Sequence, residues 1–258
     1  PRMNIMLPEI VNLLQNFMWP FVRVSVVLIA APLFGMEAIT LRIRIAIGFV
    51  LTWMIFPIVE VPEIDPLSIF AVQMMINEII VGILMGLTLQ IVLAAIITSG
   101  QAVSSSMGLG MANMVDPNLG NVPTLSQFFL VISMLLFLGL GGHLVIISIL
   151  VQSFTSLPIG AGLANTNAIQ GFLVWSSTIF IGALTLVLPI ILGLLMVNVC
   201  LGVISRASPS LNVFAVGFPA LIPLGFGMVI ITMAFIISRM ESLWFAGFQI
   251  LNENLLGL

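Results

Sequence analysis

The hydrophobic positions of this chain form long runs that short polar stretches separate. A helix of about 20 apolar residues crosses a membrane core of about 30 Å, and most of the runs approach or exceed this length. The pattern predicts six apolar helical segments: Phe17–Phe34, Ile43–Val59, Ile69–Ile97, Leu125–Val151, Phe172–Ile204 and Val213–Ile237. We therefore expect an all-α membrane protein.

Composition supports this class and excludes a soluble globule. Apolar residues fill 61% of the 258 positions and charged residues only 6%, whereas a soluble domain carries roughly 25% charged residues. Six arginines, no lysine and nine carboxylates are too few to cover a water-facing surface of this size. The net charge of −3 indicates neither nucleic-acid binding nor a polybasic lipid-binding tail.

Prolines and glycines interrupt the apolar segments and predict kinked helices. Residues 172–205 carry no charge, and a straight helix of that length would extend about 51 Å, more than the membrane core. This segment is therefore expected to be tilted, broken at Pro189 or packed partly on protein. Gly82 and Gly86 fit the spacing of small residues that lets two helices approach closely.

Two ionisable residues lie inside apolar segments, Arg23 and Glu78. Charged groups are costly in hydrocarbon, so by default they indicate function or pairing. They could belong to a proton or ion path, or form a buried pair that holds helices or subunits together. They could also reach a nearby interface. Because no second carboxylate or histidine shares their segments, structural pairing is the favoured interpretation.

The remaining reactive residues do not indicate catalysis. His143 is the only histidine, and no motif places further metal ligands or a nucleophile beside it. A hydrogen-bonded histidine near a helix end or a subunit contact is expected. The single cysteine, Cys200, lies in an apolar run and is expected to be buried. No phosphate-binding G-x-x-x-x-G-K-[ST] motif occurs. We expect no enzyme activity, no cofactor and no metal.

The longest polar stretch is predicted as a loop over Ser99–Thr124, with the sequence SGQAVSSSMGLGMANMVDPNLGNVPT. Its core combines glycines with three methionines, and a loop in water would rarely expose so many apolar side chains. Non-helical backbone at membrane depth must be buried in protein or line a cavity. Two interpretations stay open: a deformable constriction in a conduit, or a re-entrant or interfacial loop packed between helices.

Several segments together resemble the FliR family of flagellar and virulence type III secretion. The most specific runs from Arg206 to Pro219 and is similar to the family pattern R-x-x-P-x-x-N-x-F-x-x-G-x-P. The segment Asn77–Gly86, the Asp116-Pro117 pair and the Gly141-Gly142-His143 triplet support it. The resemblance covers nearly the whole chain.

The resemblance implies a fold of helical hairpins that is similar to a joined FliP-like and FliQ-like unit. Residues 1–170 would be the FliP-like part, with a plug loop at 105–121, and residues 171–258 the FliQ-like hairpin. Such a chain would join FliP-like, FliQ-like and FlhB-like proteins in a flagellar export gate of the bacterial inner membrane. The gate would project toward the periplasm, contact membrane lipid and pass unfolded protein substrates.

The resemblance also implies roles for individual residues. The apolar plug residues would be Met107, Leu109, Met111, Met114 and Val115. Asp116 lies in the same loop, and Gly108, Gly110 and Gly120 would be its hinges. In the late motif, Arg206, Pro209 and Asn212 would make structural or cytoplasm-side contacts, and Phe214, Gly217 and Pro219 complete it. Arg23, Glu78 and His143 would be buried polar groups or subunit contacts.

Two other classes of function are weighed against the export gate. A secondary transporter with a substrate site at the membrane midplane would show inverted repeats and a cluster of intramembrane polar groups. A membrane-embedded enzyme would need paired carboxylates, a nucleophile with its base, or a metal set. The sequence shows neither the transporter features nor the enzyme features clearly.

Overall fold

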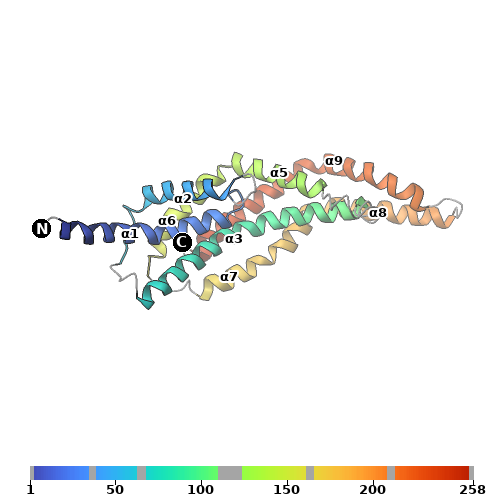
Figure 1. Cartoon of the computed structure of the whole chain (residues 1–258). Coiled ribbons are helices and arrows are strands. Elements are labelled where there is room, and N and C mark those ends of the chain that lie inside the picture. Colours follow the sequence, from blue (N-terminus) through green and yellow to red (C-terminus); the bar gives the residue numbers. More distant parts are fainter. Residues whose placement is uncertain are drawn as a thin grey trace. The chain divides into compact units, whose positions relative to one another are not determined.

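The computed structural model describes residues 3–34, 39–62, 68–109, 124–160, 166–207 and 213–255, and within these residues it is mostly helical and contains no strand. The prediction of an all-α protein is confirmed. The helices (Figure 1) are α1 (Met3–Ala30), α2 (Leu41–Ile55), α3 (Ile69–Ser106), α5 (Thr124–Gly139), α6 (Gly142–Ser156), α7 (Thr166–Ser176), α8 (Thr178–Ala207) and α9 (Val213–Ile250), followed by a π-helical turn, η3 (Leu251–Leu255).

Each predicted apolar segment is helical, but two are divided differently from the prediction. The segment Leu125–Val151 is not one helix, because Gly141 adopts a left-handed backbone with φ of 70° and separates α5 from α6. A break at Pro189, one of the three alternatives for residues 172–205, is absent, since α8 continues through this residue. The interruption lies instead at Ser177, between α7 and α8. Proline removes one backbone donor, and the remaining helix tolerates that loss.

Fewer helices can cross a membrane than the six apolar segments suggest. Among the described residues, three are long and apolar enough: Ile69–Ser106, Ile169–Ala207 and Pro219–Glu253. A fourth is reached if α5 and α6 form one broken span. The α2 helix has only 15 residues and the apolar part of α1 covers Asn16–Ala30, so both are short for a hydrocarbon core of about 30 Å.

The predicted loop begins later than Ser99, because α3 continues to Ser106. The polar residues in this stretch satisfy themselves on the helix: Ser99 Oγ donates to the Ile96 carbonyl at 2.6 Å, and Ser106 Oγ to the Ala102 carbonyl at 2.8 Å. Serine on a helix can bond to the preceding turn in this way, which hides its hydroxyl from an apolar environment. The prediction of a loop is therefore wrong for residues 99–106, which are helical.

The chain divides into two compact units. The first unit comprises Pro1–Ile91, Gly141–Ser176 and Ala246–Leu258, and the second comprises Val92–Leu140 and Ser177–Phe245. The α3 helix therefore contributes its first part to one unit and its last part to the other. The predicted division at residue 170 concerns a likeness to FliP-like and FliQ-like parts, and it stays a prediction.

In the first unit, α1 and α3 pack closely at small residues. A Cβ atom added at Gly82 would meet Val26, and one added at Gly86 would overlap Ala30. From the first pair to the second, the residue number increases by four on both helices, so α1 and α3 run parallel. Glycine has no side chain and therefore permits this close contact. The α2 helix packs on α1 (Figure 1), where Phe17 lies 5.0 Å from Phe49 between ring centroids. Trp175 of α7 donates a hydrogen bond to the Thr88 carbonyl at 3.0 Å.

In the second unit, α8 and α9 form a hairpin. Gly182 faces Leu243 and Gly193 faces Met228. The later residue of α8 therefore contacts the earlier residue of α9. The two helices are therefore antiparallel, as the prediction of helical hairpins requires. On α5, Phe137 packs on Trp244 with 4.7 Å between ring centroids, and Trp244 Nε1 donates to Ser133 Oγ at 3.0 Å.

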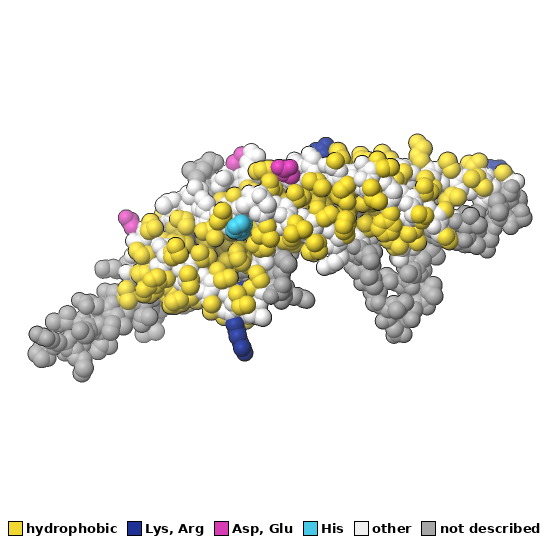
Figure 2. All heavy atoms as spheres, turned by 90° about the horizontal axis from the view of Figure 1, so that it is seen from above, with side chains coloured by type: hydrophobic (Ala, Val, Ile, Leu, Met, Phe, Trp, Pro, Cys, Tyr) yellow, Lys and Arg dark blue, Asp and Glu magenta, His cyan; other side chains and the backbone are white. Residues whose placement is uncertain are grey.

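The outer faces of the helices remain strongly apolar. On the face seen in Figure 2, hydrophobic side chains cover most of the described surface and charged ones are scattered. In the apolar 18-residue stretch of Ile169–Ala207, only 33% is buried. In the corresponding stretch of Pro219–Glu253, only 22% is buried. Exposed apolar surface of this extent indicates contact with membrane lipid or with another protein.

The contact at Gly86 yields a test of the α1–α3 packing. We expect Gly86→Ala to destabilise the protein by about 1–3 kcal/mol, because the added methyl group forces two helix backbones apart. The matched control is Gly202→Ala on α8, where an added Cβ meets nothing within 4 Å. Thermal unfolding in a mild detergent measures both, and equal melting temperatures for the two variants would contradict the packing.

Candidate functional site

The first unit contains a buried ion pair between Arg23 of α1 and Glu78 of α3. Arg23 Nε lies 2.6 Å from Glu78 Oε2, and Arg23 Nη2 donates to Glu78 Oε1 at 3.0 Å. The two residues are 1% and 2% exposed. Two parallel bonds from a guanidinium fork to a carboxylate form the strongest and most directional ion-pair geometry in proteins.

The remaining Arg23 donors bind the end of α6. Nη1 donates to the Ser153 carbonyl at 2.9 Å and to Ser153 Oγ at 3.2 Å. Nη2 also donates to the Leu157 carbonyl at 2.9 Å. The guanidinium Cζ lies 4.4 Å from the centroid of the Phe154 ring, in cation–π geometry. One side chain therefore joins three helices of the first unit.

This arrangement favours the structural interpretation of Arg23 and Glu78. A guanidinium has five N–H donors, and the bonds above use the full set. Both carboxylate oxygens of Glu78 accept from Arg23, so the pair is neutral as a whole. A fully bonded buried pair fixes helix positions and has no donor left for a passing ion or substrate.

His143 is not joined to this pair in the structure. It occupies the first turn of α6, directly after Gly142, and it is half-buried. Its Nδ1 atom is buried without a hydrogen-bond partner in the described part of the chain. The expectation of a hydrogen-bonded histidine is therefore not met within the described residues for this atom. Its suggested role as a subunit contact stays a prediction.

The start of the predicted plug loop lies in the second unit. Met107 follows α3 directly and is fully buried. A Cβ atom added at Gly225 of α9 would collide with the Met107 side chain, so the methionine lies against the bare glycine backbone. Gly108 has a φ of 77°, a left-handed conformation that glycine adopts without steric cost and that commonly ends helices. Leu109 is half-buried.

Most of the predicted plug lies outside the residues that the structure describes. Six of the candidates lie outside the described residues: Gly110, Met111, Met114, Val115, Asp116 and Gly120. Their role stays a prediction. Met107 packs between α3 and α9, and Gly108 has a left-handed backbone directly after it. The hinge role of Gly108 and the plug role of Met107 and Leu109 also stay predictions.

The residues of the late motif flank the connection between α8 and α9. Arg206 is exposed in the last turn of α8, where a cation is favoured by the helix dipole. Pro209 and Asn212 lie outside the described residues. Phe214 belongs to the first turn of α9, Gly217 is buried on it, and Pro219 is exposed within it.

The structure also corrects the expectation for Cys200 and adds residues that the sequence did not suggest. Cys200 is exposed rather than buried, because it lies on the outward face of α8. Ser153, Phe154 and the Leu157 carbonyl complete the Arg23 site, and Gly225 completes the Met107 contact. No local pattern indicates these partners, because each lies more than 100 positions from the residue it contacts, as the printed sequence shows.

Fold and site together define an all-α membrane protein that has few charged groups and contains a buried ion pair. The chain belongs to the bacterial export proteins, family 1, whose model matches residues 14–246. It is 34% identical over 241 residues to the flagellar biosynthetic protein FliR of Escherichia coli, which covers 93% of this chain and 92% of that protein.

Other relatives carry the same description. The flagellar biosynthetic protein FliR of Pectobacterium carotovorum is 36% identical over 218 residues, 84% of each chain. That of Bacillus subtilis is 28% identical over 232 residues, covering 88% of this chain and 90% of the relative. The resemblance read from the sequence is thereby confirmed at the level of the family.

The buried pair can be tested by a double-mutant cycle. We expect Arg23→Leu and Glu78→Leu each to cost about 3–5 kcal/mol, because each leaves an uncompensated buried charge. The double variant should cost clearly less than the sum. Unfolding in detergent measures the cycle, with exposed Arg239→Leu as a control. Additive losses would show that the two residues are not coupled.

The Met107 contact can be tested in the same way. Gly225→Ala should destabilise the protein by about 1–3 kcal/mol, because its methyl group occupies the space of the Met107 side chain. Combining it with Met107→Ala should recover part of that loss. The control is Gly227→Ala on the same helix, where an added Cβ meets nothing within 4 Å. If Gly225→Ala and Gly227→Ala unfold at the same temperature, the contact does not exist.

Proposed function

We propose that this chain is a non-enzymatic subunit of the flagellar type III secretion export gate, in the bacterial inner membrane. The observation that carries the proposal is the family match over residues 14–246, together with relatives described as flagellar biosynthetic proteins. In this role the chain forms, with FliP-like and FliQ-like subunits, the channel for unfolded export substrates.

The distribution of apolar surface supports membership of an assembly. The α8–α9 hairpin exposes many large apolar side chains, among them Phe180, Ile181, Met196, Ile230 and Ile231. Lipid could cover part of this surface. FliP-like and FliQ-like subunits would cover the rest, and an FlhB-like protein is a further expected partner. The periplasmic projection of the gate belongs to the same proposal.

The end of α3 supports a plug at the following loop. Met107 is fixed in the second unit by its burial against Gly225, and Gly108 turns the chain immediately afterwards. The loop that follows is rich in methionine and glycine. Methionine is flexible and fills irregular gaps, a property suited to a seal that must yield to different substrates. We assign this segment to the closed pore of the gate.

The satisfied ion pair disfavours the transporter interpretation. A midplane substrate site would need polar groups that are free to bind a ligand. In the first unit the donors of Arg23 and both oxygens of Glu78 are used within the chain. Energy for export would then come from partner proteins or from the proton gradient.

The plug can be tested in cells whose own copy of the gene is deleted. We expect the wild-type chain to restore secretion of flagellar proteins. Deleting Gly108–Gly120 should leave the subunit assembled but make the inner membrane permeable to ions and small solutes, because the seal is lost. Ion leakage and secretion are measured in the same cultures.

Two outcomes would contradict the proposal at different levels. If the wild-type chain does not restore secretion although it accumulates in the membrane, the export function is wrong. If secretion is restored and the deletion variant assembles without any increase in permeability, the plug is wrong while the export function stands.

A further inference from the structure

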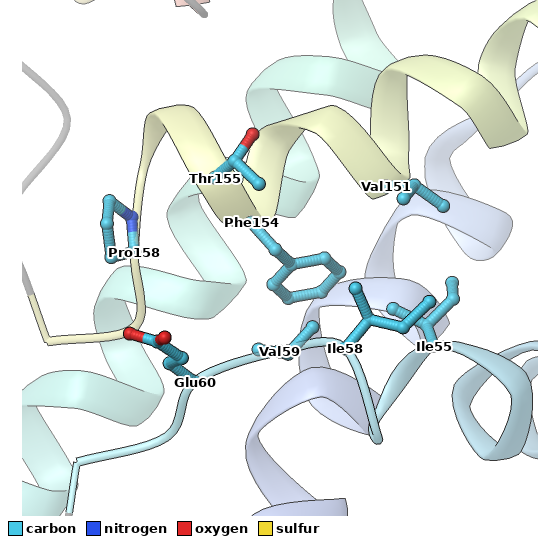
Figure 3. A pocket seen from close by; sticks show the side chains of 8 residues that line it. All are labelled: Ile55, Ile58, Val59, Glu60, Val151, Phe154, Thr155 and Pro158. Carbon is cyan, nitrogen blue, oxygen red and sulfur yellow. The ribbon is translucent and has the colours of Figure 1, made fainter.

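The first unit holds a preformed cavity that neither the ion pair nor the plug uses. It lies between the end of α2 with the residues that follow it and the end of α6 (Figure 3), and its volume is about 320 Å³. Its lining residues come from these two places: Ile55, Ile58, Val59 and Glu60 on one side, and Val151, Phe154, Thr155 and Pro158 on the other.

The floor of this cavity is held in place by the buried ion pair. Phe154 lines the cavity, and its ring also packs on the guanidinium of Arg23. Because Arg23 is bonded to α3 and to the Ser153 and Leu157 carbonyls, the ring is fixed in position. Close by, Gly160 leaves room for the Pro62 ring. A pocket that exists before binding saves the cost of ordering it.

The rim of the cavity is acidic and lacks a basic partner. Glu60 is exposed at the edge and makes no hydrogen bond or ion pair with any described residue. Among the described residues, no basic side chain lines the cavity. In the sequence Glu63 and Asp65 follow closely, and there is no arginine or lysine between Arg44 and Arg206. The apolar floor favours an apolar side chain, and the acidic edge favours a positively charged group beside it.

We propose that this cavity receives a basic peptide segment of a partner protein. One apolar side chain of the segment fills the space over Phe154, and a neighbouring lysine or arginine pairs with Glu60. The charge decides between occupants, because the Glu60 carboxylate at the rim repels a lipid phosphate and attracts a cation. The proposal rests on the proposed function only in that the chain acts within an assembly.

The first experiment changes the charge and the volume of the cavity in cells that depend on this chain. Glu60→Lys reverses the rim charge, and Thr155→Trp fills the opening. The matched controls are Glu253→Lys, an exposed carboxylate outside the cavity, and Leu144→Trp, an exposed position on the same helix as Thr155. Membrane accumulation of each variant is measured beside secretion, so that loss of folding is separated from loss of binding.

The second experiment identifies the occupant. A photoreactive benzoylphenylalanine replaces Ile58, which lines the cavity and is 72% exposed. We expect a crosslink to a peptide segment that contains lysine or arginine. Glu60→Lys and Thr155→Trp should each lower its yield by about tenfold or more, because like charges and steric overlap both oppose docking. Replacing the partner's basic residue by glutamate should restore the yield with Glu60→Lys.

The outcomes separate this proposal from the export function. Crosslinks to lipid alone, or protein crosslinks that neither variant weakens, would overturn the peptide site even if secretion is normal. Crosslinking reports on the cavity whether or not secretion is restored. A wild-type chain that crosslinks as expected but supports no secretion would keep the docking site and overturn the export function.

Discussion

The first unit depends on one interaction, the buried pair of Arg23 and Glu78. Two charges inside an apolar protein are tolerable only when each is paired and hydrogen-bonded. Here the requirement sets geometry: the guanidinium must reach the carboxylate on α3 and two carbonyls at the end of α6 at once. It also fixes Phe154, and through that ring the floor of the proposed docking cavity. Polar chemistry thus positions helices whose apolar contacts alone specify little.

Glycine supplies the second constraint, because it decides which helices approach closely. Gly82 and Gly86 admit α1 to α3, and Gly193 admits Met228 between the helices of the α8–α9 hairpin. The opposite faces of that hairpin remain apolar and exposed. A hairpin that packs tightly inside and exposes apolar faces outside is suited to packing against other subunits. The chain's family consists of bacterial export proteins.

The sequence predicted what depends on local composition and missed what depends on distant partners. The apolar runs indicate helices because backbone groups in an apolar environment must bond within the helix, and the late motif from Arg206 indicates the family. Arg23 and Glu78 stood out because charge is rare in such runs. Their bonds to α6 could not be read, since long-range contacts leave no local pattern. The serines near Ser99 suggested a loop, yet side-chain bonds to the preceding turn keep them helical.

The central claim is that this chain is a subunit of an export gate, and native mass spectrometry after gentle detergent extraction tests it most directly. The chain is co-expressed with FliP-like and FliQ-like proteins from the same organism and purified through a tag on this chain alone. The account predicts one hetero-oligomer containing all three proteins, of a mass well above the 27.8 kDa of the single chain. A stable monomer, recovered without either partner while both are present in the membrane, would contradict it.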